Sequence, residues 1–188
     1  MTDDSGRPAP PAGTRPREWG PVHWDTTGSP LGTLLVAVTD SGVLRIGLPA
    51  EDHDAILAGL ARASGSPPER SAAHLRETTG ELREYFAGTR RRFDVPVDLR
   101  LSSPFRERVQ RAMLTIGYGR TVSYGRLARM AGAPAGAARA VGGACAHNPV
   151  PLVVPCHRVL PAGGGVGNYR GGAAMKTYLL DLEERHGH

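Results

Sequence analysis

Three prolines lie in and around a short apolar run just before the second cysteine, and their spacing limits the secondary structure that this run can form. The run Val150–Val154 is broken or flanked by Pro149, Pro151 and Pro155. Proline lacks a backbone donor and is confined to edge or end positions in sheets, so the run reads as a short strand-like segment and not as a helix. Cys156 follows at once, and we expect its thiol at the end of an element, with a loop after it.

Cys156 is followed by His157 and Arg158, two side chains that can carry positive charge. Positive charge beside a thiol lowers its pKa, and the thiolate is the form that attacks in nucleophilic chemistry. We therefore expect Cys156 to be a nucleophile with a lowered pKa. The alternative is a buried and inert cysteine, which is what most lone cysteines are.

The chain has 188 residues with 40% apolar content, which suits one globular unit or a small domain attached to a larger one. No stretch approaches the roughly 20 apolar residues that a membrane helix requires. Met1–Trp19 is rich in proline, glycine and alanine and lacks the apolar core of a signal peptide, so we expect a disordered tail over residues 1–19. Cys145 and Cys156 are the only cysteines, so we expect a reducing, cytoplasmic location.

The charge is distributed unevenly along the chain. Residues 101–170 hold one acid, Glu107, and nine arginines: Arg106, Arg108, Arg111, Arg120, Arg126, Arg129, Arg139, Arg158 and Arg170. A segment this basic predicts an electrostatic surface for a polyanion, and nucleic acid fits best. The alternative is a solvated, arginine-rich surface in a chain whose single lysine is Lys176.

The first half predicts a small α/β module over residues 20–100. Alternating apolar runs indicate strands over Val22–Asp25, Gly32–Val38, Val43–Leu48 and Arg92–Leu99, with a hairpin between the second and third. Apolar residues at helical spacing predict two helices, over residues 52–63 and 72–87. We identify no catalytic residue in this half.

The second half predicts a helical domain. Ser103 and Pro104 form a helix start, with serine as the cap and proline in the first turn. Ser123 then caps a short helix, a glycine-bounded turn covers residues 132–136, and a helix of small residues covers 137–146. Helix, tight turn and second helix form the helix-turn-helix pattern, although any small helical domain can supply such a pair.

Several motifs in the second half occur in a fixed order: Tyr118–Tyr124, Ala138–Gly143, Asn148–Pro151, Pro155–Val159, Gly167–Gly172, and Lys176 with Leu179, Leu180 and Glu183. In these motifs the chain resembles the methylated-DNA–protein-cysteine methyltransferases, also called alkylguanine-DNA alkyltransferases. The resemblance implies an α+β fold. A small α/β, ribonuclease H-like domain with an antiparallel sheet (20–100) precedes an all-α, winged-helix-like helix-turn-helix domain (101–188).

The resemblance also implies the reaction. An alkyl group on the exocyclic oxygen of guanine in double-stranded DNA, or less well of thymine, moves irreversibly to Cys156, which consumes the protein. By similarity, His157 accepts the thiol proton through a water, and Glu183 orients the imidazole, in the logic of a hydrolase triad. Without the motif, His157 would be a loop histidine and Glu183 a helix-end charge.

We expect no cofactor, no bound metal and no membrane, and a monomer in solution. Whether the protein binds cooperatively along DNA stays open.

Other roles that the resemblance implies concern the duplex, which must release the target base. Arg139 would replace the flipped nucleotide, and Tyr124 would crowd the adjoining phosphate and donate to the purine. Ala138 and Gly142 would let the recognition helix approach the minor groove. Asn148 would be a hinge between that helix and the active-site loop. Simpler readings are a phosphate contact for Arg139, a core aromatic for Tyr124 and a turn residue for Asn148.

The substrate pocket should be formed by the glycine-rich loop after Cys156 and its neighbours. By similarity, we expect Tyr169 and Arg170 in its wall, with Val159, Pro151 and Lys176 as further pocket residues. Relatives commonly carry a small polar residue where this chain has Arg170, so a side-chain contact there is in doubt. A backbone N–H donor to the guanine oxygen would survive this change.

Three other functions fit part of the pattern. A cysteine hydrolase would use the same cysteine and histidine, but it would need an oxyanion site and no basic helix pair. A lesion sensor that binds DNA without turnover is disfavoured, because such relatives replace the cysteine. A zinc-binding regulator would need four ligands, and Cys145, His147, Cys156 and His157 lack the usual spacing.

Overall fold

The computed structural model describes residues 19–187 of the chain. The disordered tail expected over residues 1–19 therefore lies outside the described residues, except for Trp19. The two halves of the described chain share one hydrophobic core, which contains strand residues of the first half and helix residues of the second. Within residues 19–187, no helix is long and apolar enough to cross a membrane.

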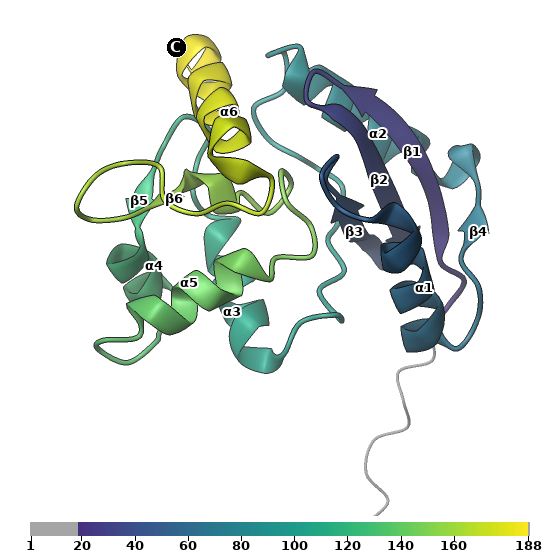
Figure 1. Cartoon of the computed structure of the whole chain (residues 1–188), viewed down its shortest axis with the longest axis horizontal. Helices are drawn as coiled ribbons and strands as arrows, with labels where there is room; N and C mark the ends of the chain where they lie inside the picture. Colours follow the sequence, from purple (N-terminus) through teal and green to yellow (C-terminus); the bar gives the residue numbers. More distant parts are fainter. Residues whose placement is uncertain (1–18, 188) are drawn as a thin grey trace, which may run out of the picture.

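The N-terminal half contains a four-stranded sheet in the order β3-β2-β1-β4. Its strands are β1 (His23–Ser29), β2 (Gly32–Thr39), β3 (Gly42–Gly47) and β4 (Glu69–Arg70), shown in Figure 1. The first three are antiparallel neighbours, whereas β4 pairs in parallel with β1. We expected an antiparallel sheet, but the sheet is mixed, because Glu69 and Arg70 add a short parallel strand at its edge.

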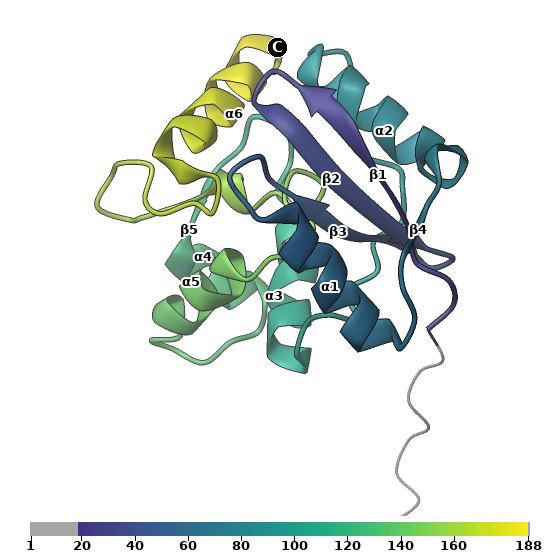
Figure 2. The ribbon, with the colours of Figure 1, turned by 45° about the vertical axis from the view of Figure 1, so that its right-hand side comes forward.

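Two helices cover the two faces of this sheet, α1 (His53–Ser64) and α2 (Ala72–Phe86). Neighbouring residues of a strand point to opposite faces. Leu35 of β2 accordingly packs on the α1 side, and Leu34 and Val36 pack in the core that contains α2. Figure 2 shows α1 lying across its face of the sheet. The other face also meets the C-terminal half, where the N–H of Ile46 in β3 donates to the carbonyl of Pro149.

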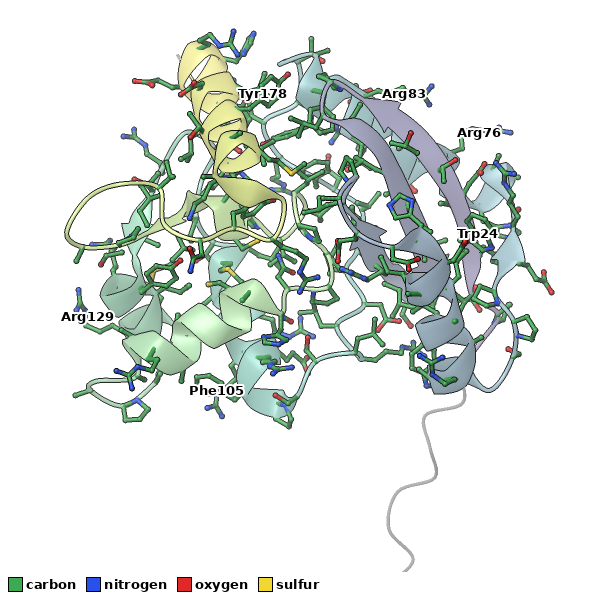
Figure 3. The ribbon with its side chains drawn as sticks, viewed as in Figure 1. Trp24, Arg76, Arg83, Phe105, Arg129 and Tyr178 are labelled. Atoms are coloured by element: carbon green, nitrogen blue, oxygen red, sulfur yellow. The ribbon has the colours of Figure 1, made fainter. Side chains whose placement is uncertain are left out.

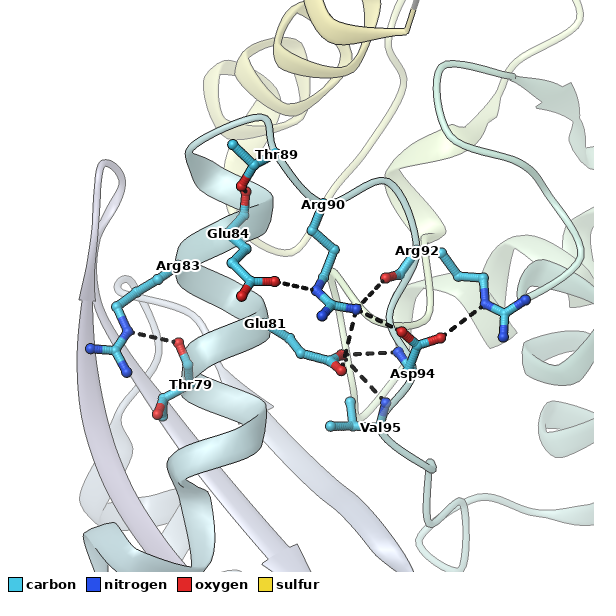
Figure 4. Close-up of polar contacts among 9 residues, drawn as sticks. All are labelled: Thr79, Glu81, Arg83, Glu84, Thr89, Arg90, Arg92, Asp94 and Val95. Atoms are coloured by element: carbon cyan, nitrogen blue, oxygen red, sulfur yellow. Dashed lines mark hydrogen bonds and ion pairs between the residues drawn. The ribbon is translucent and has the colours of Figure 1, made fainter.

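The strand predicted over Arg92–Leu99 does not form. The segment makes one isolated bridge, from Val97 to β3. Two of its N–H groups are used elsewhere, because the buried carboxylate of Glu81 on α2 accepts from Asp94 at 2.9 Å and from Val95 at 3.3 Å. Figure 4 shows this carboxylate at the centre of a charged network that holds the segment to α2. An alternating pattern in the sequence cannot show that a side chain has replaced a strand as hydrogen-bond partner.

The C-terminal half is mainly helical. Its helices are α3 (Pro104–Met113), α4 (Tyr124–Met130), α5 (Ala138–Ala146) and α6 (Gly172–His186), and a 3-10 helix, η1, covers Cys156–Arg158. Two strands of two residues each, β5 (Val122–Ser123) and β6 (Val159–Leu160), pair in parallel, so the expected all-α domain also contains a minimal sheet. Helices α4 and α5 pack against each other across a turn and form the predicted helix-turn-helix.

Two local predictions in this half need correction. Ser103 occupies the cap position of α3 but its side chain makes no capping hydrogen bond, whereas Ser123 accepts from the N–H of Arg126 as expected. The run Val150–Val154 is not a strand but a buried turn, in which Leu152 has a φ of 76°. Proline supplies no N–H groups for a ladder, so the run closes on itself.

Candidate active site

Cys156 is the first residue of η1, and its side chain is buried at 7% exposure. The amide of Asn148 donates to its sulfur at 3.2 Å and to the carbonyl of Val154 at 2.8 Å. The same side chain accepts from the N–H of Val150 at 3.1 Å. Asn148 therefore joins the end of α5, the proline turn and the thiol, as a hinge residue in this position would.

The environment of Cys156 differs from the one we expected. Burial raises the pKa of the thiol, and Asn148, Arg170 and Lys176 oppose this effect only in part. Arg158, the neighbour expected to lower the pKa, points away and donates to Glu183 and to a backbone carbonyl. The expectation of a lowered pKa was wrong, because the thiol is buried and Arg158 is paired with Glu183.

Glu183 lies under η1 because α6 folds back over it. Its Oε1 lies 2.8 Å from Nε2 of His157, and both side chains are buried, at 1% and 0% exposure. Arg158 donates to both of its oxygens, and the N–H of Gly119 donates to Oε2 at 3.0 Å. Although burial alone would raise the pKa of Glu183, His157 and Arg158 hold it well below its usual range.

This partner fixes the tautomer of His157. A carboxylate only accepts hydrogen bonds, so Nε2 must carry the hydrogen, and Nδ1 of a neutral ring keeps its lone pair. Nδ1 is buried and has no hydrogen-bond partner among residues 19–187. Burial lowers the pKa of His157 against the opposing effect of Glu183, so the resting ring is neutral. A neutral imidazole with a bare Nδ1 can accept a proton.

A cavity of about 750 Å³ opens onto Cys156. One wall is α5, and the other is the glycine-rich loop that leads to α6. The predicted residues Tyr124, Ala138, Arg139, Gly142, Tyr169 and Arg170 line this cavity together with Gly143, Cys145, Ala146, Cys156, Pro161, Gly167 and Asn168. The structure thus gathers the nucleophile, the small-residue helix and the loop around one opening.

Side chains at the rim and in the wall are held in different ways. Arg139 is exposed, as a side chain that meets another molecule must be. Arg170 donates to the carbonyl of Ala146 and lies 3.5 Å from the carboxylate of Glu51 in the first half. The hydroxyl of Tyr169 is buried without a hydrogen-bond partner in the described chain.

Three residues expected in the pocket lie behind its wall. Val159 and Lys176 are fully buried and Pro151 is buried in the proline turn, and none of them lines the cavity. The ammonium of Lys176 donates to the carbonyl of Val159 at 2.7 Å. This bond fixes the chain just after η1, so Lys176 supports the loop and does not reach the opening.

Two further residues of the buried cluster could not be predicted from the sequence. Arg158 looked like part of a basic surface, yet it is an internal partner of Glu183. Tyr85 lies in α2, which was predicted from its apolar residues at helical spacing, and its hydroxyl donates to Glu183 at 2.8 Å. We identified no catalytic residue in the first half from the sequence, and Tyr85 adds a contact from that half to the buried cluster. No local pattern could reveal Tyr85, because it meets Glu183 across 98 residues of chain.

The remaining arginines of the basic segment lie mostly on the surface. Six of the nine are exposed, namely Arg108, Arg111, Arg120, Arg126, Arg129 and Arg139. Figure 3 shows Arg129 pointing outward from α4, whereas Arg76 and Arg83 point outward from α2 at the opposite end of the molecule. The exposed arginines of residues 101–170 lie on the half that holds the cavity, and that segment contains one acid, Glu107.

Comparison with known proteins agrees with this arrangement. Residues 22–99 match the model of the 6-O-methylguanine DNA methyltransferase, ribonuclease-like domain, and residues 104–185 match that of the DNA binding domain of the same family. The chain belongs to the 6-O-methylguanine DNA methyltransferase family. This membership agrees with the fold class expected from the motifs.

Individual members of the family resemble the chain over most of its length. The methylated-DNA–protein-cysteine methyltransferase of Mycolicibacterium paratuberculosis is 42% identical over 88% of this chain and 94% of its own. The human protein of that name is 36% identical, over 84% and 78% of the two chains. The crystal structure of Mycobacterium tuberculosis O6-methylguanine methyltransferase superposes with a TM-score of 0.76 at 39% identity, covering 88% and 94%. A structure of OGT from that organism in complex with DNA has the same TM-score, covering 87% and 94%.

A titration of the thiols tests the resting state of this site. Burial raises the pKa of Cys156, and it raises that of Cys145 to about 12, so we expect both thiols of the folded protein to ionise at a higher pH than those of the unfolded chain. Thiols of the unfolded chain ionise near their ordinary pKa of about 8.5. Thiolate absorbance of folded and unfolded protein measures the difference. Ionisation of one thiol of the folded protein below about pH 8 would contradict it.

Proposed function

We propose that the protein repairs DNA by moving a methyl or larger alkyl group from the exocyclic oxygen of guanine, and less well of thymine, to Cys156. The observation that supports this best is a cavity that exposes a thiol between a small-residue helix and a glycine-rich loop, with a histidine–glutamate pair behind it. The names of the relatives, and the complex of a close neighbour with DNA, support the same chemistry. Each molecule reacts once, because nothing removes the alkyl group.

The proposed step needs a thiolate only when substrate is present. The thiol proton moves from Cys156 to Nδ1 of His157 through a bridging water, and Glu183 stabilises the charged ring. Sulfur attacks the alkyl carbon, and the S–C bond forms as the C–O bond breaks. The electron pair stays with the purine, which takes up a proton and becomes ordinary guanine. We assign the donor to that purine to Tyr124, which lines the cavity.

A base inside a duplex must be flipped out to reach this cavity. Arg139 is exposed at the rim, and its planar guanidinium can fill the gap in the stack and bond the orphaned base. Ala138 and Gly142 have little or no side chain, so they add little bulk to α5. A Cβ added at Gly142 would contact the ring of Tyr124 at 3.9 Å. These features favour entry of α5 into a minor groove with little dependence on sequence.

A monomer in a reducing compartment, the cytoplasm, completes the proposal. Both cysteines are free thiols, which the chemistry requires of Cys156. Among residues 19–187, the exposed large apolar side chains are Leu101, Leu114 and Met130, which supports the absence of an apolar dimer surface.

Intact-mass analysis tests the proposed chemistry. Excess duplex with O6-methylguanine should add one methyl group to each molecule, on Cys156 by peptide mapping, with no further turnover. Cys156→Ser is the matched control, and it should stay unmodified although Cys145 lines the same cavity. Methyl on Cys145, or several turnovers per molecule, would overturn the assignment.

Glu183→Gln tests the relay. Loss of the negative charge beside His157 should slow alkyl transfer by at least roughly 10²-fold, the lower range for general-base assistance, with DNA affinity nearly intact. Glu184→Gln is the control, because Glu184 is exposed on the same helix. Single-turnover rates, with a melting curve to confirm folding, decide the point. An unchanged rate in folded Glu183→Gln would reduce Glu183 to a structural charge.

Arg139→Ala separates base flipping from chemistry. The variant should react almost normally with the free base O6-methylguanine but should lose rate on duplex, by on the order of 1–3 kcal/mol of activation free energy. Arg129→Ala, which removes an exposed arginine outside the cavity, serves as the control for charge. An equal loss on both substrates would show that Arg139 shapes the pocket, and no loss on duplex would make it an ordinary surface arginine.

A further inference from the structure

Tyr85 brings the N-terminal half to the buried His157–Glu183 pair. Its side chain is fully buried on α2. Its hydroxyl lies 2.8 Å from Oε1 of Glu183 and 3.4 Å from Nε2 of His157. One hydroxyl thus reaches both members of the pair from a helix that belongs to the other half of the chain.

The direction of these hydrogen bonds follows from the charges. Glu183 is ionised and can only accept, so the hydroxyl of Tyr85 donates to it. The oxygen of Tyr85 then turns its lone pairs toward Nε2 of His157. If the ring carried its hydrogen on Nδ1, the bare Nε2 would face the carboxylate of Glu183 and the hydroxyl oxygen of Tyr85. The proton of that hydroxyl is already donated to Glu183, so no proton would lie between Nε2 and either oxygen. Tyr85 and Glu183 therefore favour the same tautomer.

The other contacts of the carboxylate leave it little freedom. Arg158 donates to both oxygens and Gly119 to Oε2, so Oε1 is held in line with Nε2 of His157. Tyr85 is the donor that fixes Oε1 from the side of the first half. Without its hydroxyl, Oε1 would keep its contacts with His157 and Arg158 but would lose the one donor that holds it from the side of α2.

Aromatic packing fixes the position of the hydroxyl. The ring of Tyr85 packs against Phe86, Phe93 and Tyr118, with centroids 5.4, 5.3 and 6.1 Å away. Burial, and then the charge of Glu183, raises the pKa of Tyr85 well above its ordinary value, so the phenol keeps its proton throughout the working pH range. The donor is rigid and always protonated.

We propose that Tyr85 is a positioning residue of the relay, which holds Glu183 and the Nε2–H tautomer of His157 so that Nδ1 stays bare and can receive a proton. The N-terminal half is then part of the alkyl-transfer site and more than a scaffold. This inference rests on the proposed function, in which Nδ1 receives the proton of Cys156. Tyr85 touches neither the cavity nor the substrate, so it acts only through the other two residues.

Tyr85→Phe tests the inference, with Tyr118→Phe as its matched control. The hydroxyl of Tyr118 is also buried beside this cluster, but it makes no hydrogen bond to any described residue. Loss of one hydrogen bond to a charged group should slow transfer by roughly tenfold in Tyr85→Phe. The single-turnover rate at saturating duplex should fall while the Kd for DNA stays the same, and the free base should be slowed as much as the duplex.

A double-mutant cycle with Glu183→Gln separates positioning from packing. If Tyr85 acts through Glu183, Tyr85→Phe should slow the Glu183→Gln protein much less than it slows the wild type. Fully additive losses, or a Tyr85→Phe rate equal to that of Tyr118→Phe, would overturn the inference. Wild-type protein that takes up methyl on Cys156 in the same assay shows that such a failure belongs to Tyr85 and not to the proposed function.

A measurement on the wild-type protein needs neither variant nor alkyl transfer. The hydroxyl proton of Tyr85, buried and bonded to a carboxylate, should give a proton resonance that exchanges slowly with water and has an Overhauser contact to the ring of His157. Absence of this resonance would overturn the inference even if wild-type protein took up no methyl, or if Tyr85→Phe did not fold.

Discussion

The arrangement of the site depends on one buried ion pair, between Glu183 and Arg158. Arg158 donates to both carboxylate oxygens, and the two side chains are at most 8% exposed. Removing one member of such a pair leaves an uncompensated buried charge, which costs roughly 3–5 kcal/mol. The pair joins α6 to η1, and through Gly119 and Tyr85 it reaches the loop before β5 and helix α2. Four separate segments therefore meet at one carboxylate.

This ion pair also sets the chemistry of the thiol. Because Arg158 already neutralises Glu183, the carboxylate holds His157 in one tautomer without forcing it to carry a proton. The thiol of Cys156 is buried and keeps its proton as well. In the proposed function, this neutral pair would protect a nucleophile that is used only once from stray electrophiles. The thiol would pass its proton to His157 only when an alkylated base enters the cavity.

Much of this could be predicted from the sequence, because its signals are local. Helical spacing placed α1 and α2, and Ser123 marked the start of the helix-turn-helix. The ordered motifs around Cys156 led to the family. What could not be predicted are contacts between distant segments. Glu81 replaces a strand over residues 92–99, and Arg158 turns inward although it stands beside the cysteine. A side chain's direction and burial depend on the packing of the whole fold, which no short window of sequence contains.

The protonation of His157 in the resting protein tests the account most directly. Nitrogen chemical shifts of its ring should show a hydrogen on Nε2 and a bare Nδ1, because Nε2 donates to the carboxylate of Glu183 and lies beside the hydroxyl oxygen of Tyr85. Because burial lowers the pKa of His157, the neutral form should persist below the ordinary histidine pKa of about 6.5. A charged ring at neutral pH, or a hydrogen on Nδ1, would contradict the proposed path of the proton.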